Sequence, residues 1–191
     1  MPASDENSLS LGVVYAIPPQ PADEASTRWI DAGPISIGVE YRELDPESLL
    51  ASYEDKPQSM EELLKAGGAT FTDEGVSFHV KSSQNDHEYL RFDVFIGDPH
   101  YHYIRNASET EPISNHIIPF DVAAHGEMFE WTLRCLRERL PAMLAEVDAE
   151  DLVADLDPSR LAKAVDEAEV LARGAQANLE KVRRVVDHAA R

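Results

Sequence analysis

The sequence predicts an α+β fold: an antiparallel, meander-like sheet with a long helix packed on one face, followed by a helical C-terminal extension. Two observations predict it. Segments of alternating apolar and polar residues, separated by turn residues, dominate the chain up to residue 120. Two long helical patterns follow them, and no strand pattern comes later. Strands grouped ahead of long helices argue against alternating βαβ units.

The chain begins with a polar segment, residues 1–8, which we expect to be disordered. Apolar residues within 9–17 predict a first strand, and the prolines after it prevent further pairing. Residues 29–44 are predicted to be mostly extended, because apolar and polar side chains alternate there.

Two short helices are predicted next. Asp45 is a suitable N-cap and Pro46 a suitable first residue for a helix that ends before Pro57. A second helix is predicted over residues 59–68, because a capping-box pattern opens it and a pair of glycines ends it.

The middle of the chain predicts the main part of the sheet. Alternation over residues 76–81 and 89–96 indicates two strands joined by a polar loop. The turn Gly97-Asp98-Pro99 leads into a strand that begins at His100, and residues 115–120 predict a last short strand.

Asp121 is the predicted N-cap of a long helix that extends to Val147. We expect its apolar side to lie across the sheet, and we expect Pro141 to kink the helix near residue 137 or to split it. Apolar side chains recur along this helix at three- and four-residue intervals: Phe129, Leu133, Leu136, Leu140, Leu144 and Val147.

A last helix is predicted from Asp157-Pro158 towards Arg191, with a seven-residue repeat of apolar and mostly small side chains. The repeat favours association of residues 148–191 with a second copy of the chain over a tail folded back on its own domain. The predicted organisation is therefore a disordered N-terminus (1–8), an α+β domain (9–147) and a helical extension (148–191).

Composition limits the possible partners. The formal net charge of −19 repels nucleic acids and anionic lipid, so we expect neither as a partner. No run of about 18 apolar residues predicts a membrane span. The N-terminus lacks the basic and apolar regions of a signal peptide, and the single cysteine, Cys135, forms no intrachain disulfide. A cytoplasmic location is expected.

The most informative motif is a pair of histidines in the strand that follows Pro99. Side chains alternate along a strand, so His100 and His102 are predicted to share one face and Tyr101 and Tyr103 the other. Two imidazoles so placed are typical ligands of one zinc (Zn) or iron (Fe) ion, which needs three or four ligands in all.

The third ligand is not fixed by any spacing in the sequence. Which face the pair occupies depends on the turn before it, because a slip of one residue inverts the strand. Alternatives without a metal remain: structural histidines at the mouth of a pocket, or acid–base catalysis by a histidine with a tyrosine or aspartate. The candidates for the third ligand are His79, His116, His125, Asp93, Asp98, Glu109 and Glu127.

Residues 76–147 resemble an uncharacterised bacterial domain family. The resemblance implies a small α+β domain and carries no activity with it. It rests on the order of four motifs: Gly75-Val76-Ser77-Phe78-His79-Val80, then Tyr89-Leu90-Arg91-Phe92-Asp93, then Asp98-Pro99-His100-Tyr101-His102-Tyr103-Ile104, then Pro119-Phe120-Asp121.

Two functional hypotheses follow. The first is a small soluble metal-binding protein, with hydrolase, lyase and oxygenase activity as the reaction classes and a small molecule as the ligand. Its candidate catalytic residues are Tyr101, Tyr103, Asp93 and Arg91. The second is a non-catalytic, oligomeric interaction module or accessory subunit that docks through its C-terminal helix. The sequence contains no complete catalytic motif that decides between them.

Overall fold

The structure, a computed structural model, describes residues 13–15, 19–54, 60–61, 64, 72–107 and 113–189, and it describes the side chains of those between residues 19 and 177. The disorder predicted for residues 1–8 and most of the helix predicted over 59–68 lie outside the described residues.

Within the described residues, seven strands form one antiparallel sheet in the order β1-β7-β6-β5-β4-β3-β2. Strands β2 to β7 are neighbours in chain order, so they form the predicted meander, and β1 pairs with β7 at the far edge. The strands are β1 (Val13–Tyr15), β2 (Arg28–Asp31), β3 (Ile35–Leu44), β4 (Asp73–Ser82), β5 (Glu88–Phe95), β6 (His100–Arg105) and β7 (Ser114–Pro119).

The helices complete the predicted α+β fold, which is confirmed. The short helix α1 has the predicted start, because the Asp45 side chain accepts hydrogen bonds from the backbone N–H groups of Glu47 and Ser48. The helices are α1 (Pro46–Ala51), α3 (Val122–His125), α4 (Met128–Arg134), the π-helix η1 (Cys135–Arg139), α5 (Leu140–Ala145), α6 (Glu150–Ala154) and α7 (Pro158–Ala189). No helix in the described part of the chain combines the length and apolar character that a membrane crossing needs.

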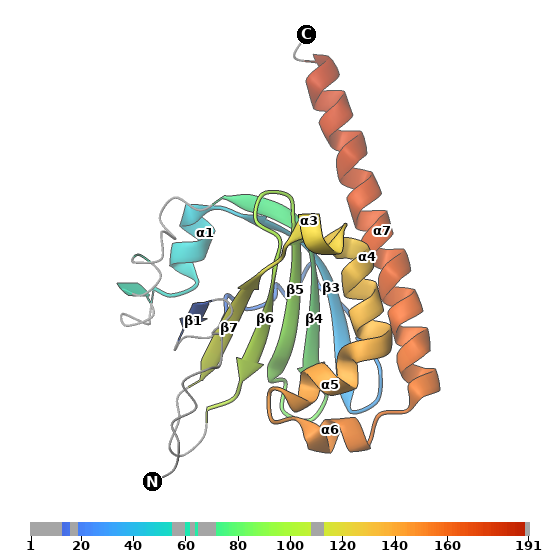
Figure 1. The fold of residues 1–191 in the computed structure, drawn as a ribbon. Coiled ribbons are helices and arrows are strands. Elements are labelled where there is room, and N and C mark those ends of the chain that lie inside the picture. The colour runs from blue at the N-terminus through green and yellow to red at the C-terminus, as the bar shows by residue number, and fades with distance from the viewer. Residues whose placement is uncertain are drawn as a thin grey trace.

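One face of the sheet is apolar and lies under α4, α5 and the first half of α7 (Figure 1). Strand alternation produces this face: Phe78 on β4 and Phe92 on β5 are fully buried, and the Phe129 ring of α4 packs edge-on against Phe78. This side of the sheet holds the hydrophobic core, so the opposite side is left for the polar members of the same strands.

The long helix predicted from Asp121 is interrupted. Asp121 caps only the single turn of α3, and Gly126, at φ 77°, ends that turn before α4 begins. The predicted disturbance ahead of Pro141 is present as η1, which ends at Arg139. Proline has no N–H and its ring crowds the carbonyl four residues earlier, and the wider π turn accommodates both effects.

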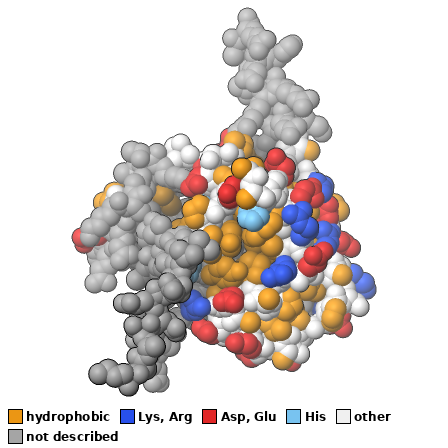
Figure 2. Space-filling view, in the orientation of Figure 1, with side chains coloured by type: hydrophobic (Ala, Val, Ile, Leu, Met, Phe, Trp, Pro, Cys, Tyr) orange, Lys and Arg blue, Asp and Glu red, His pale blue; other side chains and the backbone are white. Residues whose placement is uncertain are grey.

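The first half of α7 packs on β3, β2 and β4. Its buried side chains are small or branched and recur on one side of the helix: Leu161, Ala164, Val165, Ala168 and Ala172. Ion pairs join the same part of α7 to η1 and α4, including Arg137 with Asp166 at 2.9 Å and Arg173 with Glu130 at 2.9 Å. Figure 2 shows acidic and basic side chains side by side over this helix layer.

Beyond these contacts α7 continues past the end of the sheet to Ala189 (Figure 1). The association of residues 148–191 with a second copy stays a prediction.

Candidate metal centre

The face of the sheet away from the helix layer is lined by buried polar side chains from five strands. Residues that precede β2, together with α1 and Tyr53, cover part of this face: Gln20 accepts a hydrogen bond from Arg42 at 3.0 Å, and Tyr53 is buried. Buried charges are unfavourable unless they are paired, so this face must be an organised network. Its buried members are Glu40, Arg42, Ser77, His79, Arg91, Asp93, His100, His102 and Asn115.

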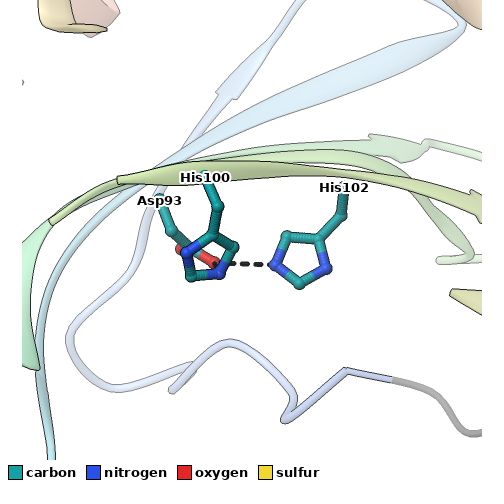
Figure 3. A group of neighbouring side chains, drawn as sticks. All are labelled: Asp93, His100 and His102. Atoms are coloured by element: carbon teal, nitrogen blue, oxygen red, sulfur yellow. Dashed lines mark hydrogen bonds and ion pairs between the residues drawn. The ribbon is translucent and has the colours of Figure 1, made fainter. Parts of the chain in front are cut away.

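Three of these side chains converge on one point (Figure 3). Asp93 on β5 pairs directly with His100 on β6, and His102 lies two residues further along the same face of β6. His102 Nε2 lies 3.0 Å from Asp93 Oδ2, and His100 Nε2 lies 3.4 Å from the same oxygen. One ligand atom from each residue lies within 4.8 Å of the others, so the three could hold one metal ion.

The other ring nitrogen of each histidine, Nδ1, lies within hydrogen-bond distance of an oxygen atom. His100 Nδ1 lies 2.7 Å from the backbone carbonyl oxygen of Asp98, and His102 Nδ1 lies 2.8 Å from Asn115 Oδ1. Both partners are acceptors as placed, so each Nδ1 carries a proton and donates it. In a neutral imidazole the lone pair is then on Nε2. This is the arrangement in which histidines usually bind metals, with the second nitrogen donating to a fixed acceptor.

This arrangement suits a cation beside Asp93, either a proton or a metal ion. With both Nδ1 atoms protonated, two Nε2 lone pairs would face a carboxylate oxygen, which is repulsive unless a proton or a metal ion lies between them. Two ligands held at about 2.0–2.1 Å by one tetrahedral zinc ion lie about 3.3 Å apart. The separations of 3.0 and 3.4 Å are near that spacing, and the 3.0 Å contact is also a hydrogen-bond distance.

The three groups differ in their protonation. Burial alone would raise the pKa of Asp93, but the contacts with His100 and His102 and the charge of Arg91 hold it well below its usual range. Burial opposes a charged His100, yet Asp93 raises its pKa, whereas burial lowers the pKa of His102. Without a metal, these shifts favour a proton on His100 over one on His102. Ser77 Oγ donates a hydrogen bond to Asp93 Oδ1, which leaves Oδ2 facing the imidazoles.

His79 belongs to a neighbouring cluster on the same face. Its Nδ1 lies 2.7 Å from Glu88 Oε1. Its buried Nε2 lies 3.3 Å from Glu40 Oε2, without the angle of a hydrogen bond. Glu88 also accepts a hydrogen bond from Arg91 Nε at 2.8 Å. In the strand register Arg91 stands between His79 and His102, so its guanidinium separates the two clusters.

The remaining predicted ligands lie elsewhere. His116 pairs with Tyr103 in the register of β6 and β7 and so lies on the opposite face from His102. His125 is exposed on α3, beside the Phe120 ring. Asp98 and Glu127 are exposed as well. Glu109 lies outside the described residues.

The predicted catalytic candidates are divided between the two faces. Asp93 and Arg91 lie on the polar face. Tyr101 and Tyr103 lie on the helix side, where the Tyr101 ring packs 5.0 Å from Trp131. Sequence reasoning did not single out Ser77, Glu88 or Asn115, although Ser77 shares the alternation of His79 along β4. No sequence pattern marks Asn115 as a site residue, because only its pairing with Ile104 places it beside His102.

A cavity of about 470 Å³ adjoins the far end of this face, between the segment before β2 and the β4–β5 turn. Glu88 and Ile104 contribute to its wall, as does the Trp29 ring with the Lys81 ammonium 3.9 Å above its centre. Ile104 and His102 are neighbours on one face of β6, so the cavity lies one residue layer from the metal candidate. The predicted small-molecule ligand remains a prediction.

Acid is expected to destabilise the fold through Glu88. Burial alone would raise the pKa of Glu88, but Arg91 and His79 lower it far below its ordinary value of 4.5. The stability that depends on ionised Glu88 is therefore fully present above about pH 4.5 and is lost as the pH falls further. Glu88→Gln should lower the free energy of unfolding at neutral pH by roughly 2–3 kcal/mol and flatten its decrease between about pH 5 and about pH 3.

Urea unfolding over that pH range measures both effects. Asp86→Asn is the matched control, because the Asp86 side chain is 83% exposed and its removal should leave the pH dependence unchanged. A decrease in stability as steep in the Glu88→Gln protein as in the unaltered protein would contradict this role of Glu88.

Comparison with known proteins identifies a family and no activity. A family model described as a domain of unknown function (DUF7700) matches residues 29–172, which include the whole metal candidate and the first half of α7. This confirms the predicted resemblance to an uncharacterised domain family. No curated protein and no solved structure matches the chain.

Proposed function

We propose that this chain, which belongs to the DUF7700 family, is a metal-binding protein whose Asp93, His100 and His102 hold one divalent transition-metal ion. One observation carries the proposal: two Nε2 atoms, each on an imidazole fixed by a hydrogen bond to Nδ1, are aimed at the same carboxylate oxygen. The second nitrogen of a metal-binding histidine usually makes such a hydrogen bond to a fixed acceptor.

Zinc and iron are the ions that suit these ligands. Two imidazoles and one carboxylate are typical of catalytic zinc sites and of non-haem Fe(II) oxygenases. Among the described residues these three side chains form the group that could hold a metal, and structural zinc sites use four protein ligands. A three-ligand site leaves a position for water or substrate, so we propose catalysis by a hydrolase, lyase or oxygenase reaction.

Metal analysis of protein purified without a histidine tag tests the proposal. We expect about one equivalent of zinc or iron in the full chain and almost none in the His100→Ala, His102→Ala protein. The matched control is the His116→Ala, His125→Ala protein, which removes two histidines outside the converging group and should keep its metal. Equal metal in the two double variants would contradict the assignment of the ligands.

A second candidate function is an interaction module that associates through α7. It is supported by the helix itself, which continues to Ala189, beyond the described side chains that pack on the sheet and helix layer. The apolar seven-residue repeat also continues there, at Val182, Val185 and Ala189. The two functions are compatible, because the metal candidate lies on the other face of the sheet from α7.

A further inference from the structure

The helix layer does not cover the whole width of the sheet. The main contacts of α7 are with β2, β3 and β4, and those of α4 and α5 are with β5. Side chains that β6 and β7 direct to the same side are half-buried, as is the Trp131 ring beside them, and Figure 2 shows apolar side chains gathered next to the helix layer. The aromatic patch consists of Tyr101, Tyr103, Ile118 and Trp131.

The aromatic patch has the composition of a protein interface. Tyr101 and Ile118 are partners in the register of β6 and β7, and the Tyr101 ring lies 5.0 Å from the Trp131 ring and 5.9 Å from the Tyr103 ring. The four side chains therefore form one surface. The two tyrosine hydroxyl groups and the indole N–H form no hydrogen bond with any residue that the structure describes. Aromatic side chains with an available polar end are enriched at interfaces.

The end of α7 has the complementary property. The apolar side of α7 that packs on the sheet continues in the sequence past residue 177, at Leu179, Val182, Val185 and Val186. The helix runs on to Ala189, which adds about 18 Å, and the six residues of β6 span about 20 Å, so the lengths match. A continuous helix that runs past the sheet does not turn back onto its own β6 and β7 (Figure 1).

Charge favours one way of joining two copies. Residues 178–191 contain four basic and two acidic side chains, whereas the rest of the chain contains 13 basic and 34 acidic ones. Two such basic ends repel each other, but each is attracted to the acidic remainder of another copy. Next to Tyr103 the rim of the aromatic patch carries both signs, at Glu146 and Arg139, so it excludes neither.

We propose that two copies of the chain exchange the ends of their α7 helices, so that each end packs on the aromatic patch of the other copy. The inference rests on the second candidate function, association through α7, and names the surface that receives the helix. The same contact then forms twice about a two-fold axis, as in most homodimers. Each helix end gains an apolar surface and covers the strands that the helix layer leaves open.

Light scattering over a range of protein concentrations tests the exchange. The full chain should form a dimer, and Ile118→Lys should raise its dissociation constant at least about tenfold, because a charge of the same sign as the helix end then lies in both patches. Val170→Lys is the matched control and should leave the dimer unchanged, since Val170 is 71% exposed on α7 and lies outside the patch. An Ile118→Lys dimer as tight as that of the unaltered chain would overturn the exchange. A monomeric unaltered chain would instead refute association through α7 itself.

Cross-linking decides the question should the Ile118→Lys protein fail to fold. Full chains carrying His116→Cys are mixed with full chains carrying Arg184→Cys and treated with a short bismaleimide. His116 pairs with Tyr103 in the register and is half-buried beside the patch, whereas the native Cys135 is buried. The exchange predicts links between position 116 of one chain and position 184 of another. Links confined to pairs of Arg184→Cys chains would show that the helix ends pair with each other, which contradicts the exchange.

Discussion

Asp93→Asn is expected to lower the affinity of the protein for Zn²⁺ by roughly a hundredfold or more. The substitution removes the charged oxygen that both imidazoles face and replaces it with a neutral group that ligates metals poorly. The substitution almost preserves the shape of the side chain, and Ser77 can still hydrogen-bond to it. The expected decrease in affinity is therefore due to the loss of a metal ligand. Competition with a chromophoric chelator at constant pH measures the affinity.

Asp98→Asn is the control for this prediction. Asp98 is a neighbouring carboxylate whose side chain is exposed, and it holds His100 through its backbone carbonyl, which the substitution leaves in place. The affinity of the Asp98→Asn protein for Zn²⁺ should therefore equal that of the unaltered chain. A similar loss in both variants would point to a general effect of negative charge rather than to a ligand.

A chain that ends after Leu156 is expected not to fold. The deletion removes α7, whose first half covers β3 with Leu161, Val165 and three buried alanines. Burial of a leucine or valine side chain contributes about 1.5–3 kcal/mol, and total stabilities are only about 5–15 kcal/mol. Exposure of the core of β3 adds to the loss. Circular dichroism should show no cooperative thermal transition for this shorter chain.

A chain that ends after Ala177 separates folding from association. It keeps every buried position that the structure describes in α7, so it should unfold at nearly the same temperature as the full chain. Light scattering should then report a monomer for this chain and a dimer for the full chain if the end of α7 mediates association. A cooperative transition in the chain that ends after Leu156 would contradict the role of α7 in the core.

The local alternation of the sequence predicted most of the sheet. Polar and apolar residues alternate along β4 and β5, and the Gly97–Pro99 turn separates β5 from β6, so the strands and their order follow from short-range pattern. The shared face of His100 and His102 follows from the same period of two. These features depend on neighbours in the chain, which a single sequence contains.

The third ligand depends on pairing between strands, which the sequence does not specify. Asp93 was one of seven candidates, and only the register that sets it opposite His100 singles it out. Asn115 is brought to His102 in the same way, by the register of β6 and β7. A slip of one residue would have turned the pair towards the helix layer instead.

The tail shows how one pattern serves two structures. Positions 161, 164 and 168 fit a seven-residue repeat, yet in the structure they pack on the chain's own sheet. An amphipathic helix with small residues can pack either on the chain's own sheet or on a second copy of the chain, so the pattern alone does not distinguish them. The prediction of one long helix from Asp121 did not take Gly126 into account. This glycine ends α3 and so divides the predicted helix.

A crystal structure of the zinc-loaded chain, with anomalous diffraction measured at the zinc edge, tests the metal assignment. We predict one strong anomalous peak about 2.0–2.1 Å from His100 Nε2, His102 Nε2 and Asp93 Oδ2, with Nδ1 of each histidine still held by Asp98 and Asn115. A peak at His116, His125 or another surface group, with the contacts between Asp93 and the two histidines unchanged, would contradict it.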